Sequence, residues 1–387
     1  MLRWLIGGFK YVSPPNVFAR LTAMASAIRD DMHLKSNSHI GGITISAALA
    51  VAQRDNWSGD QLLRGIVAGY DLSAILGTAV QQSPGYNRHM RPSGLIGAFA
   101  STAAIIAATD PSEDTAVNAL SFAANMASGT NQWAWSGTLE IFTEMGTASQ
   151  QGIVAFDLAD AGMLCSEDLL EGRAGYFAAY SASQGEELFR RGLEKPVGSG
   201  IEDVRFKPIP GCNYIQTPAS VALKLAKECD ASQIESIFVG CTTGAKNYPG
   251  CDYAGPFATV LQTKMSIQFS VSAVLLHGDT SESLFNRVND REIEDLAKKC
   301  AVEPLEEFKQ PFEEGRQPAR VEVTLSDGRT LKEELPDVPW LDGDQVLARF
   351  QAEVGSIVQS ADALKQLLAE VEDLQALQSV SGLVVLY

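Results

Sequence analysis

The chain has 387 residues, 45% of them hydrophobic and 20% charged, a composition typical of a globular protein long enough for two domains. Its formal net charge of −17 repels phosphate backbones, and no Lys/Arg cluster offsets it, so nucleic acid is excluded as an expected partner. No uninterrupted apolar run reaches the roughly 18 residues that cross a bilayer, so we expect no membrane association.

The six cysteines form no Cys-x-x-Cys pair, and no signal peptide precedes them. We therefore expect free thiols in a reducing compartment and a cytoplasmic protein. The four histidines lie at no ligand spacing to these thiols, so we expect no metal site. The apolar residues 1–9 are short and lack a cleavage site, which favours a first core helix or strand over a targeting peptide.

The first half of the chain predicts a series of apolar helices. Ser58 and Gln61 form a capping box at the start of one of them, and Pro84-Gly85 follows its end. Helices rich in Ala and Gly approach one another closely and are buried on all sides. The expected helices span residues 16–29, 42–53, 59–76, 94–108, 115–127 and 144–162.

A polar loop at residues 30–39 separates the first two apolar helices and carries Asp30, Asp31 and His39. Loops of this kind carry function disproportionately often. Either carboxylate could orient the imidazole of His39 through a hydrogen bond.

Residues 204–218 form a second candidate segment. Pro208 and Pro210 fix φ and remove two N–H donors, so we expect an extended, rigid chain around Lys207. We also expect a helix over residues 219–228, with Thr217 as N-cap and Pro218 at its first position. A lysine beside a helix start suits an anionic or carbonyl ligand, with Cys212, Asn213 and Gln216 nearby. The same residues also suit a surface turn with a buried cysteine, and Cys212 has no adjacent imidazole to activate it as a nucleophile.

The pattern changes to α+β after about residue 194. Residues 234–241 alternate like a strand, and residues 320–335 form a hairpin around an Asp-Gly turn. Helices are expected at 267–276, 290–299, 346–358 and 361–376. We expect an all-helical domain at 1–200, an α+β lid domain at 201–338, and C-terminal helices at 339–387 that return to the helical domain.

Five motifs, in order, resemble those of one family, the MmgE/PrpD group of 2-methylcitrate dehydratase, cis-aconitate decarboxylase and iminodisuccinate epimerase. They are residues 65–77, Arg91-Pro-Ser-Gly, residues 170–180, Phe206-Lys-Pro-Ile-Pro-Gly-Cys and residues 320–331. The resemblance spans residues 16–353. It implies a mainly α fold with a large all-helical domain, a smaller α+β lid, an active site in the cleft between them, a homodimer, and no cofactor.

The resemblance also implies site residues. His39 matches a site histidine and Lys207 the lid lysine, so we expect His39, Lys207 and Asp31 to be catalytic. Arg91 replaces a second site histidine, and Arg88 and His89 would join it as an anion shelf at a helix N-terminus. The substrate-binding residues expected in all are Asp30, Arg88, His89, Arg91, Ser93, Glu144, Cys212, Asn213, Gln216 and Gln268.

Four further family positions are replaced. The family's lysine and histidine in one turn become Ile141 and Glu144, another histidine becomes Gln216, and a tyrosine becomes Phe269. A di- or tricarboxylate needs several charge-assisted contacts, each contributing about 1.5–3 kcal/mol. We therefore expect a substrate less anionic than citrate-type acids.

The family reactions start with proton abstraction next to a carboxylate or carbonyl. The resemblance implies a cofactor-free lyase acting on a small carboxylate or carbonyl compound. An isomerase, epimerase or cyclase working by proton transfer is the second reading, and a non-catalytic binding partner is the third.

Overall fold

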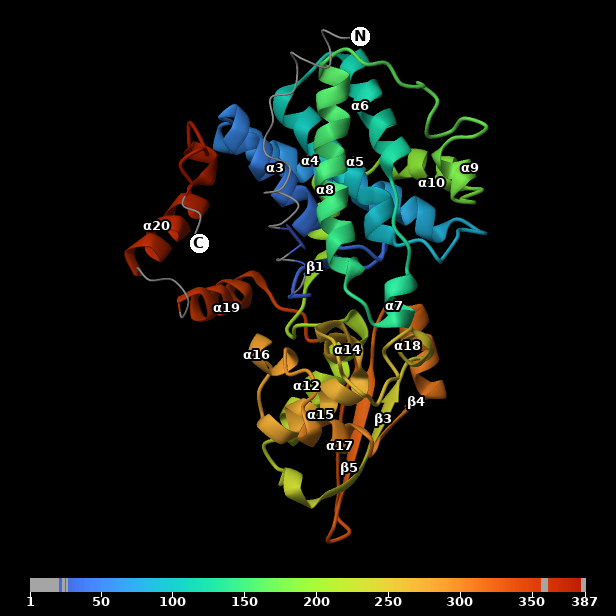
Figure 1. The fold of residues 1–387 in the computed structure, drawn as a ribbon, viewed down its shortest axis with the longest axis vertical. Coiled ribbons are helices and arrows are strands. Elements are labelled where there is room, and N and C mark those ends of the chain that lie inside the picture. The colour runs from blue at the N-terminus through green and yellow to red at the C-terminus, as the bar shows by residue number, and fades with distance from the viewer. Residues whose placement is uncertain (1–20, 23–24, 26, 356–360, 384–387) are drawn as a thin grey trace.

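The computed structural model describes residues 21–22, 25, 27–355 and 361–383. The expectation for residues 1–9, and most of that for helix 16–29, lie outside these residues. Leu21, Thr22 and Ala25 are helical, but Ile28 and Arg29 are not, so that helix ends earlier than expected. The chain folds into a helical domain stacked end to end on a smaller α+β lid (Figure 1), which confirms the expected fold class.

The helical domain is built around α5, which is apolar on every face and mostly buried. Its neighbours α4 and α8 run along it over much of its length (Figure 1). The Ser58 capping box at the start of α4 is present as expected. The helices here are α3 (Ile40–Asp55), α4 (Gly59–Gln82), α5 (Pro92–Thr109), α6 (Glu113–Met126), α7 (Gln132–Ser136), α8 (Glu140–Asp160), α9 (Tyr176–Ala179), α10 (Gly185–Gly192) and α11 (Ser199–Glu202).

Two of these helices, α4 and α5, are long and apolar enough to cross a membrane by length and composition alone. Neither is an uninterrupted apolar run, because Asp71 interrupts α4 and Ser101 interrupts α5. Within the described structure 78% of the apolar window of α5 is buried, and half of that of α4. Core helices pass the same test because their environment is also apolar.

The lid is a four-stranded sheet in the order β4-β3-β5-β6, with β3 and β4 parallel and the other pairs antiparallel. Buried residues alternate along β5, so one face of that strand packs against the lid core. Helices α12 and α15 contact the sheet. The strands are β3 (Ile234–Cys241), β4 (Cys300–Pro304), β5 (Ala319–Leu325) and β6 (Thr330–Leu335).

Short helices complete the lid. They are η1 (Asn213–Ile215), α12 (Gln216–Leu225), η2 (Ala231–Gln233), α13 (Thr243–Asn247), α14 (Val260–Met265), α15 (Ile267–His277), α16 (Glu282–Phe285), α17 (Arg291–Ala297), η3 (Glu306–Phe308) and α18 (Lys309–Glu313). The expected start of α12 was wrong. The helix begins at Gln216 directly after η1, and the Thr217 hydroxyl donates to the Gln317 carbonyl instead of capping. Pro218 still lies in the first turn, where a missing N–H is tolerated.

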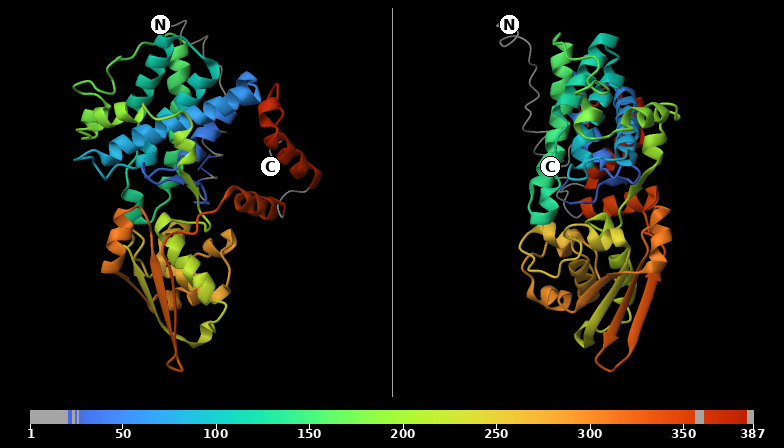
Figure 2. Two further views of the ribbon diagram at one scale, coloured as in Figure 1. Left: turned by 180° about the vertical axis from the view of Figure 1, so that it is seen from behind. Right: turned by 90° about the vertical axis from the view of Figure 1, so that its right-hand side faces the viewer.

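The C-terminal helices α19 (Gly343–Gly355) and α20 (Ala361–Glu372) lie beside the body as an arm (Figures 1 and 2). The chain meets the helical domain again after α20, at η4 (Leu374–Ala376) and the residues that follow it. There the Gly59 amide donates to the Leu377 carbonyl, and the Val380 amide donates to the Trp57 carbonyl. Backbone hydrogen bonds therefore hold the end of the chain to the start of α4.

A two-stranded sheet joins the segments on which the site depends. Strand β1 (Asp31–His33) pairs antiparallel with β2 (Val204–Phe206), and Phe206 also bridges to Leu341. The polar loop, the entry into the lid and the exit from it thus meet at one place. We did not expect these strands, because three residues carry too little pattern to predict pairing.

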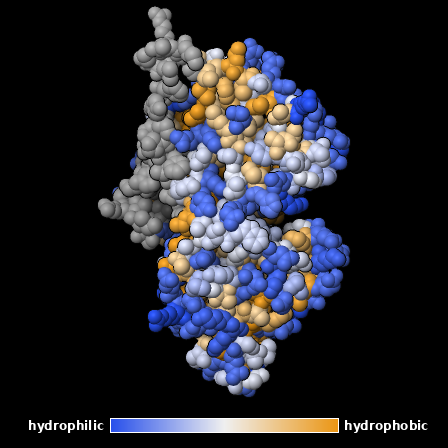
Figure 3. Space-filling model, turned by 45° about the vertical axis from the view of Figure 1, so that its right-hand side comes forward, coloured by the Kyte–Doolittle hydropathy of each residue, from blue (hydrophilic) through white to orange (hydrophobic). Residues whose placement is uncertain are grey.

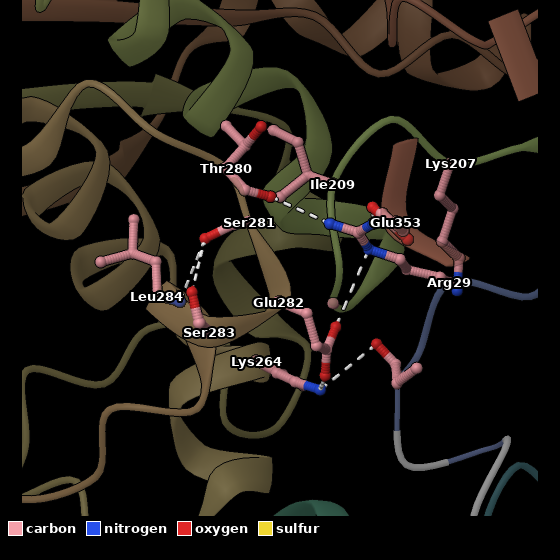
Figure 4. Close-up of polar contacts among 12 residues, drawn as sticks. Arg29, Lys207, Ile209, Lys264, Thr280, Ser281, Glu282, Ser283, Leu284 and Glu353 are labelled. Carbon is pink, nitrogen blue, oxygen red and sulfur yellow. Dashed lines mark hydrogen bonds and ion pairs between the residues drawn. The ribbon is translucent and has the colours of Figure 1, made fainter. Parts of the chain in front are cut away.

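A cluster of ion pairs lies across the seam between body, lid and arm (Figure 4). Arg29 pairs with Glu353 of α19 and donates to the Thr280 carbonyl at 3.0 Å. Lys264 of α14, fully buried, pairs with Glu282 of α16 and donates to the Ala27 carbonyl at 3.3 Å. These contacts fix the lid's inner helices against the chain that leads into the polar loop.

The close contact of α8 with α5 depends on Gly152. A Cβ there would lie 2.6 Å from the Ala98 carbonyl oxygen and closer still to Ser101. We predict that Gly152→Ala lowers the free energy of unfolding by about 1–3 kcal/mol, because the helices must separate to admit the methyl group. The measurement is urea denaturation followed by circular dichroism.

The matched control for this variant is Gly343→Ala. No atom lies within 4 Å of a Cβ at Gly343. Its free energy of unfolding is expected to stay within about 1 kcal/mol of wild type. Equal effects of the two substitutions would contradict the close packing of α5 and α8.

Candidate functional site

A cavity of about 80 Å³ lies between the helical domain and the lid. That is several times the space that one water needs. The space-filling view shows a notch in the surface between the two parts, with apolar residues scattered among polar ones (Figure 3). The cavity is lined by Ile28, Met32, Asn37, His39, Arg91, Pro92, Ser93, Asn131, Trp133, Ile141, Lys207, Cys212, Asn213, Tyr214, Tyr248 and Met265.

Asp30 holds His39 and Lys207 together at the wall of this cavity. Its Oδ2 lies 3.1 Å from Nδ1 of His39, and its Oδ1 lies 3.4 Å from Nζ of Lys207. The antiparallel register pairs Asp31 with Phe206, which brings the preceding Asp30 and the following Lys207 opposite each other. Nδ1 of His39 is engaged by Asp30, so Nε2 is the ring nitrogen left for a ligand.

The charge of Asp30 is stabilised by these two partners. Burial by itself raises the pKa of Asp30, but the charges and hydrogen bonds of His39 and Lys207 outweigh it and hold the pKa well below its ordinary value. Lys207 is fully buried, so the ion pair lies in a low-dielectric environment. Asp30 is therefore an anion that orients His39 and neutralises Lys207.

Asp31, expected to be catalytic, does not line the cavity. Its carboxylate accepts hydrogen bonds from the Tyr70 hydroxyl at 2.8 Å and from the Gly41 amide at 3.0 Å. Burial raises the pKa of Asp31, and the Tyr70 hydrogen bond offsets only part of that shift. Its contact with His39 is through its backbone carbonyl, 3.2 Å from Nδ1. Its carboxylate thus holds β1 against α3 and α4.

The polar loop is held in shape by a buried hydrogen-bond chain. Nδ1 of His33 lies 2.7 Å from the Ser36 hydroxyl, which contacts the Ser38 hydroxyl in turn. At the end of the loop, the His39 amide donates to the Ser93 hydroxyl of α5 at 3.1 Å. Burial lowers the pKa of His33 to about 4, so this ring is neutral near pH 7.

Arg91, at the N-cap of α5, has a guanidinium group that is already paired with other side chains and a backbone carbonyl. Its guanidinium pairs with Glu144 at 3.2 Å, donates to the Ile141 carbonyl and lies 5.5 Å from the centre of the Trp133 ring. Burial raises the pKa of Glu144, and the charge of Arg91 opposes this. The two replaced family positions, Arg91 and Glu144, thus contact each other as one ion pair.

The turn after Lys207 is anchored to three parts of the chain. The Gly211 amide donates to the Ile28 carbonyl at 3.1 Å, and the Cys212 amide donates to the Lys264 carbonyl at 2.8 Å. Arg349 of the arm donates to the Lys207 carbonyl at 2.6 Å. Gly211 has φ of +153°, which favours glycine. Lys207 and Cys212 are therefore fixed in position relative to the polar loop.

Six of the ten expected substrate-binding residues do not line the cavity. Gln216 is fully buried, and its amide bonds the backbone of Ile209, Gly211 and Cys212. Gln268 bonds the Tyr253 amide and Asp252. Arg88 and His89 are exposed, so the structure does not form the expected anion shelf with Arg91. Asp30 and Glu144 are not in the lining either, but they form ion pairs with lining residues. Asp30 pairs with His39 and Lys207, and Glu144 pairs with Arg91.

Phe269, which stands where some relatives have a tyrosine, packs in the lid core. Its ring centre lies 5.0 Å from that of Phe257 and 6.2 Å from that of Phe285. A tyrosine hydroxyl at this position would need a hydrogen-bond partner within the lid core, away from the cavity. Of the four replacements, only Ile141 lines the cavity directly.

Sequence reasoning did not single out the two tyrosines of the cavity's aromatic wall. Tyr214 and Tyr248 lie with ring centres 5.4 Å apart, and burial raises the pKa of both phenols, so both stay protonated. Asn131 directly precedes α7, and Trp133 lies within that helix. The position of Tyr214, two residues after Cys212 in the singled-out turn, was a usable signal. Tyr248, in a separate loop, gave none.

Three buried polar atoms of lining residues have no hydrogen-bond partner within the described residues: Oδ1 of Asn131, Nε1 of Trp133 and Oδ1 of Asn213. Leaving such a group unpaired costs roughly 1–3 kcal/mol. The Asn131 amide nitrogen donates to the carbonyls of Arg88 and Met90, which fixes which end of that amide is free. All three atoms belong to residues that line the cavity, and each atom is itself buried.

Comparison with known protein families identifies the family to which the chain belongs. A model of the MmgE/PrpD N-terminal domain matches residues 18–188, and a model of the MmgE/PrpD C-terminal domain matches residues 210–373. The chain belongs to the MmgE/PrpD family, a family of dehydratase- and decarboxylase-like enzymes. No curated protein matches the chain.

The buried neutral His33 makes stability depend on pH. Its pKa is about 4 when folded and 6.5 in the reference state, so the unfolded chain binds more protons between these values. We predict that the free energy of unfolding falls by up to about 3 kcal/mol as pH drops from 6.5 to 4. Denaturant titrations at a series of pH values measure this slope.

His33→Asn is the comparison variant, because its amide oxygen can accept the Ser36 hydrogen bond without titrating. Its slope between pH 6.5 and 4 is expected to be smaller than that of wild type. Asp30 destabilises the fold only at lower pH, as its carboxylate becomes protonated, so its contribution falls outside this window. Identical slopes for the two proteins would rule out His33 as the titrating group.

Proposed function

We propose that the protein is a cofactor-independent lyase that removes a proton from the carbon next to the carboxylate of a hydroxy acid with one carboxylate. The observation that carries this proposal is the Asp30 carboxylate held between His39 and Lys207 at the wall of the cavity. A base oriented by a carboxylate, beside a buried cation, is the combination that enolate chemistry requires.

The proposed reaction assigns a role to each group. Nε2 of His39 takes the proton, while Asp30 stabilises the imidazolium that forms. The Lys207 ammonium holds the substrate carboxylate and stabilises the charge that develops on it in the enolate. The electron pair of the broken C–H bond then forms a C=C bond as the β-hydroxyl leaves. His39 returns its proton to that hydroxyl, so water is released.

The charges of the site support a substrate with a single carboxylate. Lys207 is matched by Asp30, and Arg91 is matched by Glu144. A second or third substrate carboxylate would have to compete with Glu144 for Arg91, and would lie close to the Glu144 charge. Ile141 adds apolar surface where relatives have a lysine. These features favour an apolar or aromatic substituent next to Tyr214 and Tyr248.

The unpaired polar atoms support a hydroxyl and a carbonyl oxygen on the substrate. Nε1 of Trp133 can donate to a carboxylate or carbonyl oxygen. The side-chain oxygens of Asn131 and Asn213 can accept from a hydroxyl. A β-hydroxy acid carries both kinds of group.

A panel of acids in deuterated water tests the reaction. The panel contains a 3-hydroxy-3-arylpropanoate, cis-aconitate and 2-methylcitrate, and NMR follows deuterium uptake, loss of water from the hydroxy acids and loss of carbon dioxide from cis-aconitate. We expect the aryl monocarboxylate to react fastest. Deuterium uptake without loss of mass would indicate an isomerase or epimerase instead, and faster turnover of either tricarboxylate would overturn the substrate assignment.

Adjacent carboxylates provide a matched test of the dyad. We predict that Asp30→Asn lowers the exchange rate about 10²–10⁴-fold, because His39 loses the charge that stabilises its protonated form. Asp31→Asn keeps the backbone carbonyl that contacts His39, so its exchange rate is expected to change less than tenfold. Equal losses in the two variants would remove Asp30 from the mechanism. The readout is NMR exchange on the fastest acid of the panel.

Glu144 is predicted to exclude more anionic substrates. Glu144→Gln removes the charge that neutralises Arg91, so binding of a dicarboxylate should improve about 10-fold or more relative to a monocarboxylate. The control is Glu140→Gln, an exposed residue one turn earlier on α8. Relative inhibition constants of mono- and dicarboxylates measure the effect. No change in the ratio between Glu144→Gln and the control would contradict this role.

A further inference from the structure

Two thiols meet at the lid side of the cavity. Sγ of Cys212 lies 3.8 Å from Sγ of Cys251, and Cys212 lines the cavity while Cys251 lies fully buried behind it. All six cysteines lie within the described residues 27–355 and are free thiols, and no other two of them contact each other there. Small molecules in the cavity can therefore reach the thiol of Cys212. The thiol of Cys251 is close enough for rotation of the two side chains to bring the sulfurs together.

The backbone around both cysteines is held in place. The Cys212 amide donates to the Lys264 carbonyl, and its carbonyl accepts from Gln216. The Cys251 amide donates to the Tyr248 carbonyl, and its carbonyl accepts from the Ile267 amide. An S–S bond is about 2.05 Å long, so the sulfurs must approach by nearly 2 Å, a change that side-chain rotation and small backbone shifts can supply.

From this geometry we propose that Cys212 and Cys251 are a redox-modification site that forms a reversible disulfide when a hydroperoxide enters the cavity. Closure draws the Cys212 sulfur out of the cavity and joins the Lys207 turn to the loop that carries Tyr248. The substrate cavity thus changes shape with the oxidation state of the protein. This inference does not rest on the proposed reaction.

The chemistry balances with one peroxide molecule. The Cys212 thiolate attacks a peroxide oxygen, the O–O bond breaks, and the leaving hydroxide takes a proton to become water. The Cys251 sulfur then attacks the sulfenic acid on Cys212, an S–S bond forms, and the second oxygen leaves as water. Two electrons pass from the two sulfurs to the peroxide.

The electrostatics assign the order of these steps. The hydrogen bond with Cys251 lowers the pKa of Cys212, although burial opposes this, and the Lys207 charge adds to the lowering. Burial raises the pKa of Cys251 well above its ordinary value. Cys212 is accordingly the thiol that ionises and reacts first, and Cys251 is the one that resolves it.

The test is mass spectrometry of the native full-length protein after treatment with hydrogen peroxide and blocking of the remaining thiols. Because Lys207 precedes a proline, trypsin leaves Cys212 alone in residues 206–224 and Cys251 alone in residues 247–264. We expect these two peptides to appear joined, with the mass of two hydrogens lost, and to separate after reduction with dithiothreitol. Absence of the joined pair, while Cys212 is oxidised singly, would overturn the proposal.

Variants keep the test specific. Cys251→Ser is expected to give no joined peptide and to accumulate sulfenic acid on Cys212, trapped as a dimedone adduct. Cys229→Ser, which changes a thiol outside the cavity lining, is expected to form the joined pair as wild type does. If Cys212 in wild type gave as much dimedone adduct as in Cys251→Ser, Cys251 would not be its resolving partner.

Discussion

The structure of the site depends on one buried carboxylate. Asp30 lies between His39 and Lys207, and a short antiparallel ladder between β1 and β2 sets this arrangement. Breaking a buried ion pair from one side costs roughly 3–5 kcal/mol, so these residues are expected to hold one another in place. The ladder joins the polar loop of the helical domain to the entry of the lid. The same hydrogen bonds that connect the two domains therefore also bring Asp30, His39 and Lys207 together.

The replaced family positions have different physical consequences. Arg91 and Glu144, two positions at which the resemblance implies replacements, contact each other as one ion pair. Gln216 bonds the backbone of the Lys207 turn, and Phe269 packs with Phe257 in the lid core. Those two positions now serve the lid's structure and not a ligand. The cavity is lined by His39, Lys207, the paired Arg91 and an aromatic wall, and the proposal of a less anionic substrate rests on this set.

The long elements of the fold were predictable because their pattern is local. The apolar helices between residues 40 and 160, the Ser58 capping box and the Asp-Gly hairpin appear near their expected positions. Elements that depend on distant partners were not: β1 and β2 are three residues each and exist only as a pair. The start of α12 was also misjudged, because η1 precedes it and places Gln216 at the first helical position. Capping preferences predict helix starts less reliably where a 3₁₀ turn leads directly into the helix.

The sequence by itself determined the family, the division into a helical half and an α+β half, and the candidate residues His39, Lys207, Asp30 and Arg91, since motif order and periodicity are properties of the chain. Only the tertiary structure decided which carboxylate orients His39. Asp30 and Asp31 are neighbours in sequence, but successive residues of an extended segment point to opposite sides, so one faces Lys207 and the other faces Tyr70. The pairing of Arg91 with Glu144, and of Cys212 with Cys251, likewise joins residues far apart in sequence, and such contacts are set by packing alone.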